Sequence, residues 1–117
     1  MSVLRIVPNL RTQDPGALAA FYRDLFGLDV VMDHGWIATV AADTRMVPQL
    51  SLAREGGAGT EVPDISIEVD DIEHVHAQAL GGGYDIVHPL RQEAWGVRRF
   101  FVRDPDGHVV NVLSHAG

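Results

Sequence analysis

The chain has 117 residues, of which 46% are hydrophobic, a formal net charge of −7 and no cysteine. This length fits one domain, and the apolar fraction is typical of a folded protein. The lack of cysteine excludes disulfides, thiolate metal sites and a cysteine nucleophile. The acidic balance argues against a nucleic-acid partner, because phosphates need a basic surface.

The first half of the chain predicts a strand, a helix and three more strands. Residues 4–10 are a short apolar strand, after which Asp14 caps a helix that has Pro15 at its first position. The helix should end at Gly27. Its apolar residues recur at helical spacing and predict one buried stripe, formed by Leu18, Phe21, Tyr22 and Leu25. Strands are expected at residues 28–32, 35–41 and 46–53, with the turn between the last two at 42–44.

The second half repeats this order after a glycine-rich run at residues 55–61. Residues 64–69 alternate apolar and polar side chains, as a half-buried strand does. Asp70 and Asp71 then cap a helix that ends at the glycines 81–83. Strands are expected at residues 84–87, 97–103 and 109–114, so both halves have the order β-α-β-β-β.

The last two strands flank Asp104-Pro105-Asp106-Gly107, which predicts a hairpin. Proline presets the φ of a turn, aspartate caps it, and glycine supplies a positive φ. The final strand also has an echo earlier in the chain: residues 46–53 and 108–116 share Leu-Ser-x-Ala. An internal repeat indicates two copies of one supersecondary unit.

Together these features resemble the vicinal oxygen chelate superfamily, which includes glyoxalase I, bleomycin-resistance proteins, extradiol dioxygenases and methylmalonyl-CoA epimerase. Three stretches carry the resemblance: residues 19–28, Trp95-Gly96 and residues 101–108. It implies an α+β fold with two tandem βαβββ modules that form a curved mixed sheet around a pocket, with the helices on the convex side. Residues 1–117 would be one such domain, with module one at about 3–54 and module two at about 62–116.

Enzymes of this superfamily hold a divalent metal with side chains, mostly His and Glu, from the first and last strand of each module. Carried over to this sequence, the four positions fall on Val7, Asp64, Asn111 and Pro48, or on Gln49 in place of Pro48 if the register shifts by one. Asp64 alone is an anionic ligand, so we expect no metal, no cofactor and no catalytic residue. The histidines are not expected to supply the missing metal ligands. His74 and His76 point to different faces of their helix, and the others are expected at the surface or in the core, with His115 on the same face as Asn111.

We expect the ligand-binding residues to be Trp36, Asp64, Trp95, Phe100 and Asn111. Trp95 either anchors its loop on the sheet or forms an aromatic wall, as in the antibiotic-binding members of the superfamily. Pairing Arg103 with His108 would place Phe100 on the face of Asn111, which would be largely apolar, as a small-molecule pocket is. Asp64, Ser66 and Glu68 would add acidity to this face, unless Glu68 pairs with Arg98 or Arg99.

The leading hypothesis is a metal-free, cytoplasmic protein that sequesters a planar or cationic small molecule, with pockets formed across a homodimer. We expect neither a secretory signal nor a transmembrane helix, because no basic region precedes a long apolar stretch at residues 1–8 and no apolar run reaches about 18 residues. One alternative is a metal-dependent lyase, isomerase or dioxygenase related to glyoxalase or the epimerase. Another is a protein in which the fold serves a dimer interface and the pocket has lost its role.

Overall fold

The computed structural model describes residues 2–43, 47 and 49–115. The chain forms two compact units, which are described separately. The first unit comprises Val7–Val62, and the second comprises Met1–Ile6 together with Pro63–Gly117. The first strand, β1 (Val3–Arg11), therefore contributes residues 3–6 to the second unit and residues 7–11 to the first.

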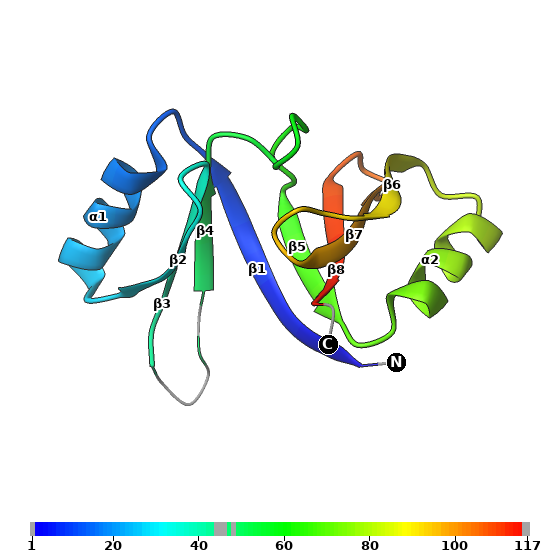
Figure 1. Cartoon of the computed structure of the whole chain (residues 1–117), viewed down its shortest axis with the longest axis horizontal. Helices are drawn as coiled ribbons and strands as arrows, with labels where there is room; N and C mark the ends of the chain where they lie inside the picture. The colour runs from blue at the N-terminus through cyan, green and yellow to red at the C-terminus, as the bar shows by residue number, and fades with distance from the viewer. Residues whose placement is uncertain (1, 44–46, 48, 116–117) are drawn as a thin grey trace. The chain divides into compact units, whose positions relative to one another are not determined.

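The first unit contains the predicted helix and a four-strand arrangement in the order β2-β3-β4-β1 (Figure 1). After β1 come α1 (Pro15–Phe26), β2 (Asp29–Asp33), β3 (Ile37–Ala41) and β4 (Gln49–Ala53). β1 and β4 run parallel, whereas β2, β3 and β4 are antiparallel neighbours. Of the expected strand at residues 46–53, residues 46 and 48 lie outside the described residues, as does Thr44 of the turn before it.

The ends of α1 lie where the sequence predicts them. The Asp14 carboxylate accepts a hydrogen bond from the backbone N–H of Ala17, and Gly27 adopts a left-handed conformation with φ of 70°. The buried stripe, however, is narrower than expected. Ala19, Leu18 and Tyr22 pack in the core with β3 and β4, but Phe21 and Leu25 are more than half exposed. The prediction that Phe21 and Leu25 are buried was wrong, because the sheet covers only one side of the helix.

The second unit has the strand order β1-β5-β8-β7-β6 and one helix. Its elements are β5 (Ile65–Val69), α2 (Ile72–Gly81), β6 (Ile86–Gln92), β7 (Val97–Arg103) and β8 (Val109–His115). β5 and β8 are parallel, and β6, β7 and β8 are antiparallel neighbours. Both modules therefore have the order βαβββ, and the prediction of an α+β fold with a mixed sheet is confirmed.

Helix α2 covers one face of the second unit's sheet. Its N-cap is Asp71, whose carboxylate accepts from the N–H of His74, and its C-cap is Gly82. The core beneath it is formed by Val69, Ile72, Ala79, Phe100 and Val112. The even-numbered residues of β7 and β8 thus point towards α2, and the odd-numbered residues point to the other face.

Two turns of the same kind bracket β7. In the turn between β7 and β8, the Gly107 N–H donates to the Asp104 carbonyl and the Asp104 N–H donates to the His108 carbonyl, both at 2.9 Å. Between β6 and β7, Gly96 donates to Glu93 at 3.3 Å and Glu93 donates to Val97 at 2.7 Å. Both glycines have φ of 91°. Each is a three-residue hairpin loop with a glycine bulge, and the predicted hairpin at residues 104–107 is confirmed.

No helix of the described residues is long and apolar enough to cross a membrane. The cytoplasmic location stays a prediction.

Candidate functional site

The face of the second unit's sheet that α2 does not cover carries the buried polar side chains of Arg99 and Asn111. We call it the polar face and define it by the residues that the strand register places on it: Ser66, Glu68, Arg99, Phe101, Asn111, Leu113 and His115. Asn111 lies between Ser66 on β5 and Phe101 on β7. Leu113 in turn lies between Glu68 and Arg99. The side chains of paired residues point to the same side, so these groups form one surface.

Asn111 has an incompletely satisfied side chain. It is 9% exposed, and its Nδ2 donates to Ser66 Oγ at 3.1 Å. Its Oδ1 is buried and has no hydrogen-bond partner among the described residues. Exchanging the two amide atoms would leave the nitrogen without a partner instead, so one polar atom is unpartnered in either orientation. A buried amide atom without a partner costs free energy.

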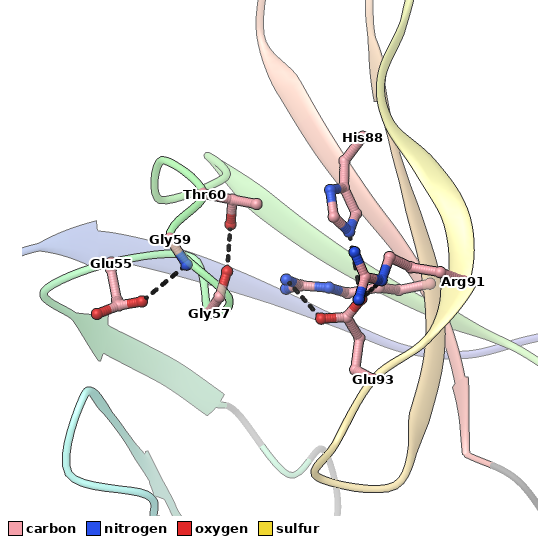
Figure 2. Close-up of polar contacts among 8 residues, drawn as sticks. Glu55, Gly57, Gly59, Thr60, His88, Arg91 and Glu93 are labelled. Carbon is pink, nitrogen blue, oxygen red and sulfur yellow. Dashed lines mark hydrogen bonds and ion pairs between the residues drawn. The ribbon is translucent and has the colours of Figure 1, made fainter.

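Glu93 is the buried centre of an ionic cluster at the end of β6. It is 4% exposed, and its Oε1 lies 3.0 Å from Arg91 Nε and 3.3 Å from His88 Nε2 (Figure 2). Its other oxygen lies 3.4 Å from Arg99 Nη2. A buried carboxylate stays charged at low cost only when such partners surround it.

Arg99 connects this cluster to the aromatic residues nearby. It is 2% exposed, and its guanidinium carbon lies 4.8 Å from the ring centroid of Trp95 and 4.7 Å from that of Phe101. Burial lowers the pKa of the Arg99 guanidinium, and the Glu93 carboxylate opposes this shift only in part. Trp95 therefore stacks on a cation that belongs to the chain itself, which fixes the ring on the sheet.

A second ionic group lies along β5. Glu68 Oε1 accepts from Arg5 Nε at 2.8 Å, and its Oε2 lies 3.0 Å from His115 Nδ1. Burial of the Glu68 carboxyl raises its pKa, but the hydrogen bond from His115 and the charge of Arg5 outweigh burial and hold the pKa below its usual value. The sequence suggested Arg98 or Arg99 as the partner. That was wrong, because Arg98 pairs with Glu73 of α2 and Arg99 with Glu93.

Phe100 does not share a face with Asn111. The sequence reasoning paired Arg103 with His108, but Arg103 pairs with Val109, so that Phe101 lies opposite Asn111 and Phe100 opposite Val112. The glycine bulge at Gly107 accounts for the difference, because a shift of one residue reverses the side to which every side chain points. Phe100 is fully buried in the core beneath α2.

The remaining expected site residues lie at different places. Asp64 precedes β5 and is exposed, and its Oδ2 accepts from the backbone N–H of Val109 at 2.8 Å. Trp36 belongs to the first unit, where its ring stacks on His34 with 6.3 Å between centroids. Asn111 and Trp95 are in the second unit, and Arg99 lies next to the Trp95 ring on the polar face.

The residues at the superfamily's metal positions do not fit a divalent ion. Val7 is buried and has no donor atom, and Asn111 has a neutral amide engaged with Ser66. The internal repeat that maps Pro48 onto Asn111 also equates Ser51 with Ser114. These two serines lie on opposite kinds of face: Ser51 bonds to Thr39 on the face away from α1, whereas Ser114 pairs with Arg98 on the side of α2. Gln49 is therefore the residue of β4 on the matching side, and it is also neutral. Among the described residues, no three His, Cys, Asp or Glu side chains are grouped so that they could hold a metal.

Sequence reasoning missed Glu93 and Arg99 as a pair. Glu93 lies in a polar connection, where a carboxylate is usually exposed, and its partners come from β6 and β7. The available signal is Gly96, three residues after Glu93, because a tight turn there brings Val97, the first residue of β7, back towards Glu93.

Comparison with known proteins assigns the family. The sequence matches the family model of the Glyoxalase/Bleomycin resistance protein/Dioxygenase superfamily over residues 3–112. The chain belongs to this superfamily, and the resemblance noted from the sequence is confirmed.

Individual relatives place the chain within a broad group. It is 28% identical over 114 residues to a bleomycin resistance protein from Klebsiella pneumoniae, which covers 92% of this chain and 90% of the relative. A superfamily member from Vibrio splendidus 12B01 has a TM-score of 0.71 at 19% identity, covering 98% of this chain and all 100% of that one. A methylmalonyl-CoA epimerase variant from Streptomyces coelicolor, in complex with 2-nitronate-propionyl-CoA, has a TM-score of 0.72 at 20% identity, covering 99% and 100%. At these identities the two structures show the fold alone.

Proposed function

We propose that this protein binds and sequesters a small aromatic molecule, in the manner that the name of its bleomycin resistance relative implies, and that it does so without a metal. The observation that carries the proposal is the buried, unpartnered amide atom of Asn111 on the polar face. A ligand that hydrogen-bonds to this atom gains free energy that the free protein lacks. Asp64 is the one anionic side chain at the superfamily's four metal positions, and a single carboxylate supports binding over metal-dependent chemistry.

The carboxylates near the polar face decide whether a cationic ligand could be bound. Glu68 and Glu93 already pair with cationic side chains, so neither is available to an incoming cation at low cost. Asp64 is exposed and accepts a backbone hydrogen bond, with no ion pair to a described Arg or His. A cationic ligand would therefore pair with Asp64, and we retain a cationic aromatic antibiotic as the first candidate class.

The test is a titration of the purified protein with basic aromatic antibiotics, bleomycin among them, followed by tryptophan fluorescence and calorimetry. Asn111→Leu should weaken binding about tenfold, since it removes the hydrogen-bonding group and keeps the size of the side chain. Asp64→Asn should weaken the binding of cationic compounds more than the binding of neutral analogues. Glu73→Gln, on the side of α2, is the matched control and should bind as the parent does.

Two outcomes would contradict the proposal. One is a flat response from every compound in both fluorescence and heat. The other is stoichiometric nickel, zinc, manganese or iron in protein purified without chelator, which would favour the metal-dependent lyase, isomerase or dioxygenase instead.

We also propose that the protein is a homodimer. Phe21, Leu25 and Phe26 of α1 are all more than half exposed, which is unusual for large apolar side chains so close together. A second copy is the partner that the proposal commits to. Sedimentation of the parent and of Leu25→Glu with Phe26→Lys tests it, and a monomeric parent at micromolar concentration would contradict it.

A further inference from the structure

A pocket of about 360 Å³ lies on the side of the second unit's sheet that faces α2. Phe100, Val102 and Val110 line it from the strands, and Val75 and Ala79 line it from the helix. Its volume is within the range of small-molecule sites, and aliphatic and aromatic side chains dominate such sites.

This pocket is separate from the polar face. Phe100 pairs with Val112, and both point towards α2, whereas Phe101 and Asn111 point to the other side of the same two strands. The sheet itself therefore separates the pocket from the unpartnered amide atom of Asn111. A ligand in the pocket touches none of the residues that carry the proposed function.

The charged residues at the rim of the pocket already have hydrogen-bonding partners. Arg103 Nε lies 3.3 Å from Asp85 Oδ2, and its Nη1 donates to the Gly107 carbonyl at 3.1 Å. The Asp104 carboxylate lies 3.0 Å from His108 Nδ1 and also accepts from the His108 backbone N–H at 2.8 Å. A charged ligand would have to compete with these pairs, so the rim favours a neutral occupant.

Two uncharged polar side chains complete the rim. Gln78 and Tyr84 line the pocket, and both are exposed. The Tyr84 ring lies against the backbone of Gly82, at whose position an added Cβ would come within 2.8 Å of the ring. Gly82 thus leaves room for the ring at the edge of the pocket, where its hydroxyl is in reach of solvent or a ligand.

We infer that this pocket binds a small neutral molecule with an apolar body and one hydrogen-bonding group near Gln78 and Tyr84. The apolar lining supplies the affinity through buried area. The charged groups of the rim already have partners, and this selects against ions. This inference stands apart from the proposed function and does not depend on it.

The probe for the test is N-phenyl-1-naphthylamine, a neutral aromatic amine whose fluorescence rises in apolar surroundings. The parent protein should give a saturable rise in fluorescence. In amide NMR spectra, the probe should shift Val102 and Val110 and leave Ser66 and the Asn111 side-chain amide unchanged. Val75→Phe fills the pocket and should raise the dissociation constant about tenfold or more.

Matched variants control for folding and for surface binding. Ala77→Phe adds the same ring at an exposed position of α2 that does not line the pocket, and it should leave probe binding unchanged. Tyr84→Ala removes one rim side chain without altering the core. It should weaken probe binding, and it provides a test even if Val75→Phe proves unstable. Circular dichroism and thermal unfolding check that each variant is folded as the parent is before its probe affinity is compared.

Three results would overturn the inference. They are no saturable fluorescence, equal probe affinity in the parent, Val75→Phe and Tyr84→Ala, or loss of probe binding in Asn111→Leu. A fourth result would also overturn the inference: the parent protein is a dimer that does not bind the probe, and Val75→Phe makes this dimer dissociate. The pocket would then be assigned to a second copy of the chain.

Discussion

Glu93 lies at the centre of the buried ionic cluster of the second unit. One carboxylate, 1% exposed at its side chain, meets Arg91, His88 and Arg99 within 3.4 Å. Arg99 is buried as well and stacks on Trp95 and Phe101. The cluster therefore holds the turn that carries Trp95, and its energetic effect is largest when only one partner is removed.

Replacing Glu93 with Gln should lower the free energy of unfolding by about 3 kcal/mol, because it removes the Glu93 carboxylate from the buried Arg99 guanidinium. Urea unfolding at neutral pH measures this. The double variant Glu93→Gln with Arg99→Met should recover part of the loss, since the buried guanidinium is then removed together with its carboxylate partner. Glu73→Gln breaks the exposed pair with Arg98 and should cost less than about 1 kcal/mol. Equal losses for Glu73→Gln and Glu93→Gln would contradict the role given to burial.

Glu68 should make stability depend on pH. Its pKa is held below the usual 4.5 in the folded protein, so its ionised form is the one that folding favours. The contribution is fully present above the unfolded pKa and is lost as pH falls through the lower, folded pKa. Comparing the parent with Glu68→Gln by thermal unfolding across pH 3–7 should show a difference that is constant near neutrality and shrinks below about 4.5. A difference that grows on acidification would refute this sign.

The misplaced Phe100 shows what sequence could not resolve at this scale. The hairpin residues 104–107 were recognised because proline, aspartate and glycine act locally on φ and hydrogen bonding. Whether that hairpin has a three- or a four-residue loop depends on the bulge at Gly107, and this choice decides whether Phe100 or Phe101 faces Asn111. No local pattern separates the two registers when two phenylalanines are adjacent.

At the scale of elements, each of the two hairpin turns of the second unit contains a glycine with φ of 91°. Gly107 has φ of 91° and open space around its missing side chain, so its requirement is conformational. Gly107→Ala should cost about 1–2 kcal/mol from backbone strain. Gly81→Ala is the matched control: Gly81 ends α2, its Cβ position is also open, and its φ is not positive. That change should be neutral or stabilising by thermal unfolding, and a loss at Gly81 equal to that at Gly107 would contradict the argument.

The helices were predicted well at their ends and less well on their faces. Asp14, Gly27 and Asp71 act as caps, as expected, because a cap depends on three or four neighbouring residues. The exposure of Phe21 and Leu25 could not be read in the same way, since it depends on how far the sheet extends beside α1. Periodicity shows that a stripe is apolar, and it does not show what covers it.

At the scale of the whole molecule, β1 belongs to both units. Arg5 pairs with Glu68 across 63 positions of sequence, and the Ser2 N–H donates to Asp70 across 68. Contacts at such separation carry no sequence signal, so the pairing of Arg5 with Glu68 cannot be predicted from the sequence. The βαβββ repeat was visible because each module is a local succession of elements.

Replacing residues 2–6 with a glycine-serine run of equal length should loosen the second unit selectively. β5 would lose its neighbouring strand and the Arg5 ion pair. Amide hydrogen exchange should therefore become faster in β5, with less effect on the β3–β4 pair of the first unit. Unchanged protection of β5 would show that residues 3–6 contribute little to the second unit.

The alternation along β7 has a consequence for how the protein can diverge. Arg99 and Phe101 point to the polar face, whereas Phe100 and Val102 line the pocket beside α2. Substitutions at odd and at even positions of one seven-residue strand therefore reach different surfaces. Mutation can alter the specificity of either surface while the other keeps its side chains, so two binding properties could be inherited and selected separately from a single stretch of sequence.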